Sequence, residues 1–411
     1  MMRWILFIVL YVLLGLYAFQ LIRNISKHTW VQYVYILISL LVLGNFLYQF
    51  WFNNDTGRVL SPMKSYAFGF LLTMVVFYLI IVVFALGEDL VRLVVGVFHK
   101  TSGKSEKFIL PSRRKFISTL ALGVAAVPFA SMLYGMYRGK YNYQVLKYDL
   151  EFDDLPEAFD GYTITQISDI HCGSFDNKEK IAYGIDLINK QQSDVILFTG
   201  DMVNNRADEL NDWQELFSTL YAKDGKFAVL GNHDYGDYFD WNSEEEKEAN
   251  LQDLKDRERK MGFDLLLNET RFLEKNGQRI ALMGVENWGA GGFKKAGDLQ
   301  KTKKDVNPDD FKILMSHDPT HWEQKVLEDD YHYHITLAGH THGMQFGIEI
   351  PGWVKWSPAR WRYKHWAGIY NEKGEYINVN RGFGYLGYPG RVGIWPEVTV
   401  IRLKKAPKSI V

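Results

Sequence analysis

Hydrophobic and polar positions follow two different patterns on either side of residue 140. The first part contains four long apolar stretches, at about residues 4–21, 31–51, 66–87 and 116–137, and none carries a charged side chain in its middle. A helix needs about 20 apolar residues to cross the hydrocarbon core of a bilayer, and each stretch is close to that length. A signal peptide would explain only the first stretch, and four buried core helices in succession are unusual. We therefore expect residues 1–140 to form a multi-span membrane anchor, an N-terminal bundle of about four transmembrane helices.

The connections between these stretches indicate the orientation, because Lys and Arg favour the cytoplasmic side of a membrane. The connection before the fourth stretch contains six basic residues, which are Lys100, Lys104, Lys107, Arg113, Arg114 and Lys115. This connection should be cytoplasmic, although Arg58 and Lys64 in the 52–65 connection reduce the contrast. The chain beyond about residue 138 is then expected outside the cytoplasm.

Two segments beside the spans add detail to this topology. Residues 112–117 read Ser-Arg-Arg-Lys-Phe-Ile and resemble a twin-arginine export signal, although a plain positive-inside anchor explains them equally well. Both interpretations place the second part of the chain outside the cytoplasm. Glu88–Lys100 is amphipathic and is expected to lie on the inner membrane surface after the third span.

Beyond about residue 146 the pattern is typical of an α/β protein, since short β-rich runs alternate with helical stretches. Strands are expected at Tyr162–Ile167, Val195–Thr199, Phe227–Leu230, Ile280–Val285, Lys312–Met315, Ile335–Ala338, Tyr376–Val379 and Val398–Leu403. Helices are expected at Lys178–Gln191, Leu210–Tyr221 and Glu244–Met261. Residues 146–405 are therefore expected to form a second domain.

Charge divides the chain at nearly the same place. The net charge of -1 combines 14 Lys and Arg with 4 Asp and Glu in residues 1–145, and 33 with 44 in residues 146–411. The acidic second part excludes a nucleic-acid binder with a broad basic face, and the apolar first part excludes a simple cytosolic protein. A single cysteine, Cys172, excludes an intrachain disulfide and a zinc site built from cysteines.

Residues that can bind metal follow directly after five of the expected strands. The five groups are Asp169-Ile170-His171, Gly200-Asp201, Gly231-Asn232-His233-Asp234, Ser316-His317-Asp318 and Gly339-His340-Thr341-His342. One such group is often only a turn, but ligands of α/β proteins bind at the carboxyl ends of strands, and five groups there indicate one site. The candidate metal ligands are Asp169, His171, Asp201, Asn232, His317, His340 and His342.

These seven residues offer nitrogen and oxygen ligands and no thiolate, which suits manganese, iron or zinc ions. The two carboxylate oxygens of Asp201 can bridge two ions. Glycine directly before Asp201, Asn232 and His340 lets the backbone turn sharply and approach an ion closely.

In one-letter code the five groups read DIH, GD, GNHD, SHD and GHTH, and this ordered set resembles the calcineurin-like metallophosphoesterase superfamily. Within it, the chain resembles the membrane-anchored bacterial phosphodiesterase branch (YkuE-like). The resemblance covers about residues 146–405 and implies an α/β fold of two mixed β-sheets packed face to face with flanking helices. Eukaryotic Ser/Thr phosphatases of this superfamily have the motifs GDxVDRG and GNHE. Here Gly200-Asp201 is followed by a different sequence, and the second motif is GNHD, which argues against a protein phosphatase.

The same resemblance implies two divalent metal ions, Mn²⁺, Fe²⁺/Fe³⁺ or Zn²⁺. It implies that one ion is held by Asp169, His171, Asp201 and His342. It implies that the second ion is held by Asp201, Asn232, His317 and His340. His233 would lie beside the phosphate.

Two divalent ions about 3.5–4 Å apart lower the pKa of a shared water, and the resulting bridging hydroxide attacks phosphorus in line. His233 is the candidate catalytic residue, as a general acid or a group that stabilises phosphate oxygens. A hydrogen bond that only orients Asn232 or Asp201 is the alternative role of His233. Asp234 and Asp318 are expected to orient neighbouring imidazoles, and Cys172 to be a small packed residue.

Aromatic and basic residues are mixed in a short segment after the last ligand histidines. They are Trp353, Lys355, Trp356, Arg360, Trp361, Arg362, Lys364 and Trp366. This mixture suits a bilayer interface or a phosphate-bearing substrate. A hairpin packed on the core, with its charges merely solvated, is the alternative. Gly382–Gly390 is expected to line another part of the site.

Together these patterns predict a membrane-bound, metal-dependent phosphoesterase that hydrolyses a phosphodiester or a pyrophosphate. Its substrate is expected to be a phosphorylated small molecule or a lipid, and a lipid-linked phosphate is favoured because the anchor confines the site near membrane lipids. Two alternatives stay open. One is a non-catalytic membrane receptor or scaffold with a metal-binding domain, and the other is a phosphomonoesterase on the same site.

Overall fold

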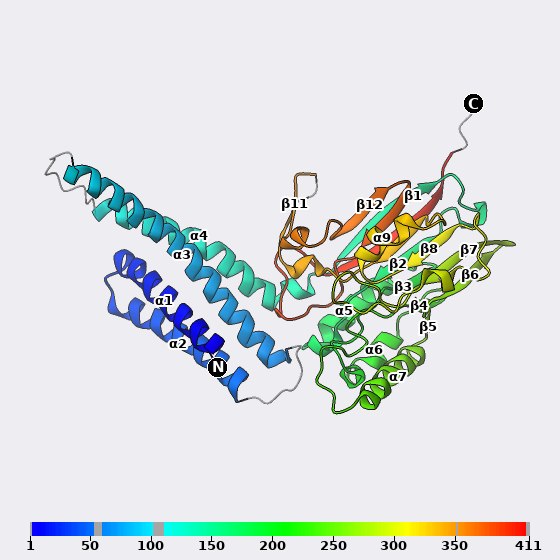
Figure 1. Ribbon diagram of the computed structural model, residues 1–411, viewed down its shortest axis with the longest axis horizontal. Coiled ribbons are helices and arrows are strands. Elements are labelled where there is room, and N and C mark those ends of the chain that lie inside the picture. The colour runs from blue at the N-terminus through cyan, green and yellow to red at the C-terminus, as the bar shows by residue number, and fades with distance from the viewer. Residues whose placement is uncertain (1, 53–59, 102–110, 351, 408–411) are drawn as a thin grey trace. The chain divides into compact units, whose positions relative to one another are not determined.

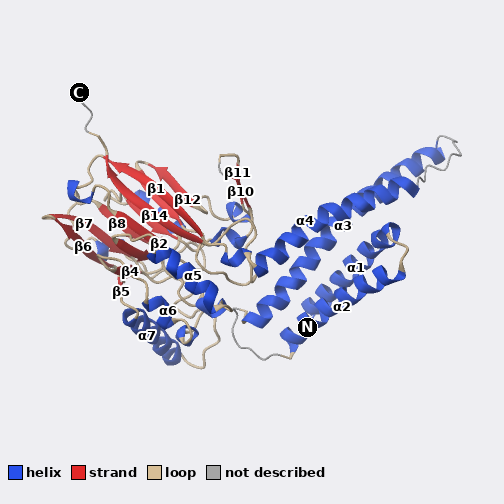
Figure 2. Cartoon of the chain, turned by 180° about the vertical axis from the view of Figure 1, so that it is seen from behind, coloured by secondary structure: helices blue, strands red, loops and turns tan. Residues whose placement is uncertain are grey.

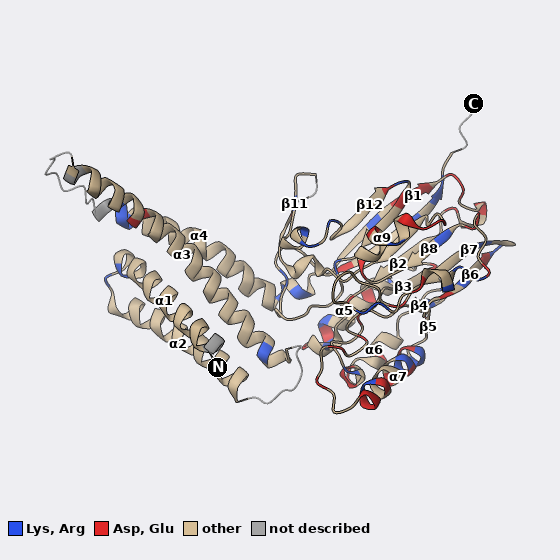
Figure 3. Cartoon of the chain, in the orientation of Figure 1, with Lys and Arg blue, Asp and Glu red and all other residues tan. Residues whose placement is uncertain are grey.

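The computed structural model of the chain describes residues 2–52, 60–101, 111–350 and 352–407. The chain divides into two compact units: the N-terminal unit ends at Tyr137, and the C-terminal unit continues from Arg138. Few charged side chains lie on the helices of the first unit, whereas the second carries many, for example on α7 (Glu244–Lys260) (Figure 3).

The N-terminal unit consists of long apolar helices. Its described helices are α1 (Met2–Ile25), α2 (Thr29–Trp51), α3 (Pro62–Thr101) and α4 (Pro111–Tyr137). Each of the four is long and apolar enough to cross a membrane. Leucine and valine side chains are freely exposed on them, with Leu6 69% and Val83 66% exposed, as expected where lipid is the solvent. The four predicted apolar helices are therefore present.

Helix α3 differs from the expected arrangement. It continues without a break through Glu88–Lys100 to Thr101, so this segment does not form a separate surface helix. Its 40 residues correspond to about 60 Å, roughly twice the hydrocarbon thickness of a bilayer. Asp89 lies in the polar C-terminal part of α3. Its carboxylate accepts a 2.6 Å hydrogen bond from the hydroxyl of Tyr17 in α1. Three of the basic residues used to predict the orientation lie outside the described residues, namely Arg58, Lys104 and Lys107.

The C-terminal unit contains two mixed sheets of six strands each (Figures 1 and 2). The first sheet has the order β1 (Gln144–Phe152), β14 (Glu397–Lys405), β2 (Thr163–Ile167), β3 (Val195–Phe198), β4 (Lys226–Ala228), β5 (Phe263–Leu265). The second has the order β12 (Gly368–Glu372), β13 (Glu375–Val379), β9 (Ile335–Ala338), β8 (Lys312–Met315), β7 (Gln278–Gly284), β6 (Glu269–Lys275). A separate hairpin pairs β10 (Ile348–Ile350) with β11 (Val354–Trp356).

The sheets pack face to face because their internal strands are apolar on both faces. Side chains alternate along a strand, so neighbours in sequence enter different cores. In β3, Val195 and Leu197 join the core between the sheets, where they meet residues of the second sheet such as Ile313. Ile196 and Phe198 of the same strand join a core on the outer face of the first sheet.

Helices cover both outer faces and complete an α/β layered domain, which confirms the predicted fold class. The first sheet is covered by α5 (Lys178–Asn189), α6 (Gln214–Ser218) and α7. The second is covered by α8 (Leu299–Thr302) and α9 (Pro319–Gln324). The helix expected at Leu210–Tyr221 is shorter, since only Gln214–Ser218 is α-helical and a 3-10 turn, η4 (Ala207–Leu210), precedes it.

The expected strands correspond to the internal strands of the two sheets, namely β14, β2, β3 and β4 in one and β13, β9, β8 and β7 in the other. The strands at the sheet edges, β1, β5, β6 and β12, were missed. Edge strands carry polar side chains and lack a continuous apolar run, as the exposed and half-buried residues of β6 show.

This topology brings the loops of the site together. Strands β2, β3 and β4 are parallel neighbours in the first sheet, and β8 and β9 are parallel neighbours in the second. The carboxyl ends of parallel neighbours lie at the same edge of a sheet, so the loops that follow them converge.

The assigned core predicts that two isoleucines contribute very differently to the free energy of unfolding. Ile313 in β8 is fully buried, whereas Ile348 in β10 is 53% exposed. Ile313→Ala should lower the free energy of unfolding by about 2–5 kcal/mol through lost burial and a cavity. Ile348→Ala should change it by no more than about 0.5 kcal/mol. Unfolding of the detergent-solubilised chain, followed by tryptophan fluorescence, measures both, and equal effects would contradict the assigned core.

Candidate metal centre

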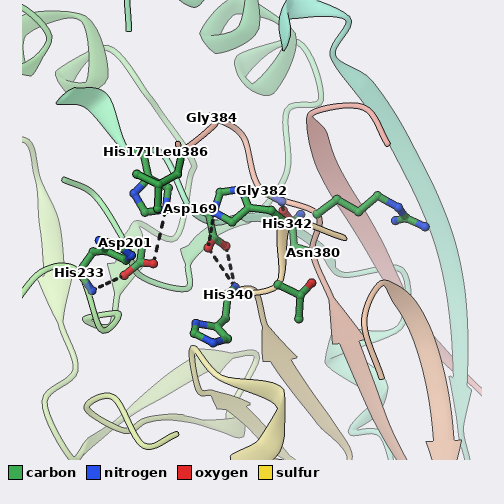
Figure 4. A network of polar contacts seen from close by, with 12 residues as sticks. Asp169, His171, Asp201, His233, His340, His342, Asn380, Gly382, Gly384 and Leu386 are labelled. Carbon is green, nitrogen blue, oxygen red and sulfur yellow. Dashed lines mark hydrogen bonds and ion pairs between the residues drawn. The ribbon is translucent and has the colours of Figure 1, made fainter. Parts of the chain in front are cut away.

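All eight predicted site residues lie on loops that follow the carboxyl ends of parallel strands. Asp169 and His171 follow β2, Asp201 follows β3, and Asn232 and His233 follow β4. His317 follows β8, and His340 and His342 follow β9. The site is therefore built from both sheets. Figure 4 shows side chains from both gathered in one place, among them Asp169, Asp201 and His340.

Asp169, His171 and His342 form a first buried group whose ligand atoms all lie within 4.8 Å of one another. The Nε2 atoms of His171 and His342 are 3.0 Å apart. Asp169 Oδ1 lies 3.2 Å from His342 Nε2. One ion at this position would have a carboxylate and two imidazoles as ligands.

Asp201, His317 and His340 form a second group of the same kind. Asp201 Oδ2 is 3.1 Å from His317 Nε2, and His317 Nε2 is 3.3 Å from His340 Nδ1. Asn232 Oδ1 lies 2.8 Å from the same His340 nitrogen, so its amide oxygen joins this group.

Asp201 lies between the two groups. Its Oδ2 atom is also 3.5 Å from His171 Nε2, which belongs to the first group. Its Oδ1 atom accepts a 2.8 Å hydrogen bond from the backbone N–H of His233. The carboxylate is thus oriented by the protein, with one oxygen directed at ligand atoms of both groups.

The donor atoms fit divalent cations. Imidazole nitrogens 3.0–3.3 Å apart repel through their lone pairs unless a proton or a cation lies between them. His317 shows which lone pair is free: its Nδ1–H donates to the Thr199 carbonyl (2.7 Å), which leaves Nε2 toward Asp201. The set contains nitrogen and oxygen donors and no thiolate, as manganese, iron and zinc accept.

Charge around the second group favours a cation in the same way. Burial alone would lower the pKa of His317, but the carboxylates of Asp201 and Asp169 raise it to about 10. Burial would raise the pKa of Asp201, yet His317 and other imidazoles hold it well below its usual value. The protein therefore stabilises a carboxylate next to a positive charge at this position.

The ligand loops have a backbone conformation that the sequence did not indicate. Five of the predicted ligands have left-handed φ angles: Asp169 52°, His171 49°, Asp201 62°, His340 71° and His342 49°. Such angles are uncommon for residues other than glycine and cost about 1–3 kcal/mol each. Backbone hydrogen bonds between the loops hold them, for example from Asp169 N–H to the Gly200 carbonyl (2.9 Å) and from Gly339 N–H to the His317 carbonyl (2.8 Å).

Asp234 was expected to orient an imidazole, but its hydrogen bonds go to backbone N–H groups. Its carboxylate accepts from Asp201, Met202 and Gly231, each at 2.8 Å. It therefore joins the turn that carries Asp201 to the turn that carries Asn232. Backbone partners leave no signal in the spacing of side chains, so the sequence could not reveal this role.

Tyr363 holds His340 from outside the site, because its hydroxyl lies 2.9 Å from His340 Nε2. Asp318 Oδ2 lies 3.3 Å from the same nitrogen but has no hydrogen-bond partner, and Asp318 Oδ1 accepts from Thr320 instead. The expected hydrogen bond from an imidazole to Asp318 is therefore not formed. The sequence did not indicate Tyr363, which is 21 residues beyond His342 and carries no motif. Because Tyr363 lies at Nε2, His340 Nδ1 is left to face the second group.

His233 is positioned beside both groups without belonging to either. Its Nδ1–H donates to the Asn204 carbonyl (2.8 Å), and its ring meets the His171 ring edge-on at 4.9 Å. Burial, the largest influence, lowers the pKa of His233, and the Asp201 carboxylate opposes this shift. Since a carbonyl only accepts, Nδ1 keeps its proton and Nε2 is the atom that can exchange one.

Gly382–Gly384 lines the site, as expected for part of Gly382–Gly390 (Figure 4). A Cβ atom on Gly382 would lie 3.0 Å from Asp169 Cβ and 3.1 Å from His342 Nδ1. The buried guanidinium of Arg391 donates to the Gly382 and Gly384 carbonyls (3.2 and 2.6 Å) and keeps this segment in place. Cys172 is fully buried, as expected for a small packed residue.

Comparison with protein families gives two matches along the chain. Residues 2–140 match the model described as probable calcineurin-like phosphoesterase, transmembrane domain. Residues 162–344 match the calcineurin-like phosphoesterase model, a range that includes all eight predicted site residues.

Individual relatives agree with these matches. The chain is 28% identical over 300 residues to the uncharacterized metallophosphoesterase YkuE of Bacillus subtilis (strain 168), covering 71% of this chain and 98% of that protein. It is 24% identical over 391 residues to a transmembrane protein with metallophosphoesterase domain of Danio rerio, covering 93% of this chain and 82% of that protein. The second alignment includes the N-terminal helices, so the combination of both units also occurs in an animal protein.

The matches confirm the resemblance seen in the five motifs. One match covers the N-terminal unit and the other lies in the C-terminal unit. Members of this family bind divalent metals, in agreement with the two ligand groups of the site. The chain is a membrane protein of the calcineurin-like phosphoesterase family, with a four-helix transmembrane domain followed by the metallophosphoesterase domain.

Proposed function

We propose that this protein is a membrane-bound phosphoesterase that uses two divalent ions to hydrolyse a phosphodiester or a pyrophosphate linked to a lipid. The observation that carries the proposal is the position of Asp201, whose Oδ2 atom faces ligand atoms of both groups (3.1 Å to His317 Nε2 and 3.5 Å to His171 Nε2). A carboxylate in this position is suited to bridge two ions.

The ligands have distinct tasks in this proposal. Asp169, His171 and His342 would hold one ion, and Asn232, His317 and His340 the other, with Asp201 shared. When bound, such ions activate water at neutral pH and withdraw charge from phosphate oxygens. The nitrogen and oxygen ligands suit manganese, iron or zinc.

His233 is proposed to give a proton to the leaving group or to hold a phosphate oxygen. Its Nδ1 is occupied by the Asn204 carbonyl, so Nε2 is the atom that acts. The His233 backbone N–H binds Asp201 Oδ1 independently of the side chain. Loss of the imidazole therefore leaves the orientation of Asp201 intact.

The membrane unit supports a lipid-linked substrate, because four spanning helices keep the catalytic unit within reach of lipid headgroups. We propose that the catalytic unit faces the outside of a bacterial inner membrane. Arg113, Arg114 and Lys115 lie near the start of α4 and favour the cytoplasmic side for that end of the helix.

Asp201→Ala should abolish turnover of bis-p-nitrophenyl phosphate and lower the metal content of the purified chain. Removal of the shared carboxylate weakens both proposed ion sites while the loops keep the Asp234 hydrogen bonds between backbone groups. Asp212→Ala, at an exposed position, is the matched control and should behave like wild type. If Asp201→Ala kept its activity within about threefold of wild type, a two-ion site would be contradicted. Loss of one catalytic group usually lowers the rate by about 10²–10⁴.

His233→Ala should retain wild-type metal content and lose about 10²–10⁴ in turnover. The loss should be smaller for substrates with a nitrophenolate leaving group, which needs no proton, than for alkyl phosphodiesters. His332→Ala, with a side chain 47% exposed and away from the site, serves as the control. Equal losses for both kinds of leaving group would show that His233 does not act as the acid.

A substrate panel separates the proposed activity from its alternatives. Faster hydrolysis of p-nitrophenyl phosphate than of bis-p-nitrophenyl phosphate would indicate a phosphomonoesterase. A chain that binds its metals and hydrolyses neither compound would indicate a receptor or scaffold.

The proposed orientation predicts the labelling of two single-cysteine variants by a membrane-impermeant maleimide on intact cells, with any outer membrane permeabilised. Asn276→Cys, in the exposed β6–β7 turn, should react, and Ser105→Cys, in the basic connection outside the described residues, should not. The native Cys172 is fully buried and provides the background. The reverse pattern would place the catalytic unit in the cytoplasm.

A further inference from the structure

The segment between the last ligand histidine and Tyr363 exposes an unusual amount of apolar surface. In the described part of the C-terminal unit, seven large hydrophobic side chains are exposed, and five of them lie in this segment. They are Met344 (45%), Ile348 (53%), Ile350 (43%), Trp353 (78%) and Trp361 (78%). Exposed apolar side chains gathered in this way mark a contact surface.

The charged side chains of the β10–β11 hairpin are bonded to the protein, although Lys355 stays exposed, and its apolar face is exposed at Ile348 and Ile350 and half-buried at Val354 and Trp356. Glu349 pairs with Lys355 across the hairpin. Glu349 is bound by Arg381 (2.6 Å), and the Lys355 ammonium donates to the Ala367 carbonyl (2.5 Å). Alternation then places Ile348, Ile350, Val354 and Trp356 together on the opposite face. A hairpin in contact with water has the reverse arrangement.

The hairpin is fixed at its base and projects from the body of the unit (Figure 1). Ser357 Oγ donates to the Gly343 carbonyl (2.6 Å), and Gly347 N–H donates to the Val392 carbonyl (2.9 Å). A two-stranded hairpin of this length is marginal on its own, so these bonds at its base hold it in position.

Basic residues accompany the exposed aromatics. Residues 352–364 include Lys355, Arg360, Arg362 and Lys364 and contain no Asp or Glu. Arg360 and Arg362 are exposed on either side of Trp361. Indole rings sit at the headgroup level of membranes, and Lys and Arg bind anionic headgroups there. This chemistry matches a bilayer surface, which the four helices of the same chain bring within reach.

We propose that the β10–β11 hairpin, together with Trp361, inserts into the interface of an anionic bilayer and holds the metal centre at the level of the headgroups. The end of the segment reaches the site directly, because the Tyr363 hydroxyl contacts His340 Nε2 (2.9 Å). Phe293 packs edge-on against His340 (4.8 Å), and the Arg362 guanidinium lies over Phe293 (5.1 Å). The benefit for a lipid substrate rests on the proposed function, whereas the insertion itself does not.

Insertion is tested with the full chain in vesicles of phosphatidylcholine and phosphatidylglycerol. Trp353→Cys and, separately, Ile350→Cys carry the environment-sensitive dye NBD, and Asn276→Cys in the β6–β7 turn is the control. The unsubstituted chain should take up no dye, since Cys172 is fully buried. NBD at 353 and 350 should emit at shorter wavelength and be quenched by spin-labelled lipids, and NBD at 276 should behave as in water.

Two fluorescence results would overturn the proposal. Water-like emission at 353 and 350 would show that the hairpin stays in solution. A blue shift without quenching by spin-labelled lipid would show that protein covers it, either the chain's own helices or a second copy.

Activity gives an independent measurement. The double variant Trp353→Ser/Trp361→Ser should hydrolyse soluble bis-p-nitrophenyl phosphate at the wild-type rate. It should hydrolyse hexadecyl p-nitrophenyl phosphate embedded in the same vesicles about tenfold more slowly, because two inserted aromatics are lost. Equal rates of variant and wild type on the vesicles would contradict the proposal, as would an equal loss on both substrates. A wild-type chain that cleaves neither compound would contradict the proposed function and leave the fluorescence result standing.

Discussion

Buried carboxylates and imidazoles that face one another require positive charge between them, and the C-terminal unit is organised around this requirement. The Nε2 atoms of His171 and His342 are 3.0 Å apart, and Asp201 Oδ2 lies within 3.5 Å of imidazoles from both ligand groups. Without a cation or shared protons, lone pairs and carboxylate charges would repel in a region that excludes water. The left-handed backbone of five ligand residues adds further cost. The surrounding hydrogen bonds, above all those of Asp234 to the Asp201 and Gly231 amides, keep the loops in this arrangement.

The internal strands supply the rigid part of that arrangement, and they are the part that the sequence predicts best. Val195–Phe198 is buried on both faces, so every residue is apolar and the run is easy to recognise. The positions of the candidate ligands were predictable for the same reason, because each group follows such a run directly. Edge strands such as β6 were not predicted, since their side chains are partly solvated. The role of Asp234 was not predicted because its partners are backbone amides. The contact of Tyr363 with His340 was not predicted because only the fold brings the two residues together.

The proposed insertion of the β10–β11 hairpin would give the catalytic unit a second attachment to the membrane, in addition to its covalent connection to the membrane unit. The four apolar helices confine the catalytic unit to the membrane, and the apolar face of β10–β11 would set its orientation at the surface. A single connection allows the unit to rotate, whereas a second contact restricts the direction in which the metal centre faces. The sequence pattern could not show that α3 continues beyond its membrane span to Thr101. A separate amphipathic helix and a continuation of the same helix have the same 3.6-residue period.

Anomalous X-ray diffraction at the absorption edge of the bound metal, from crystals of the purified full chain, would locate the ions themselves. Two peaks are expected, one on either side of Asp201 Oδ2. One should contact Asp169, His171 and His342, and the other Asn232, His317 and His340. A single peak, or peaks that do not contact Asp201, would contradict a shared carboxylate as the basis of this site.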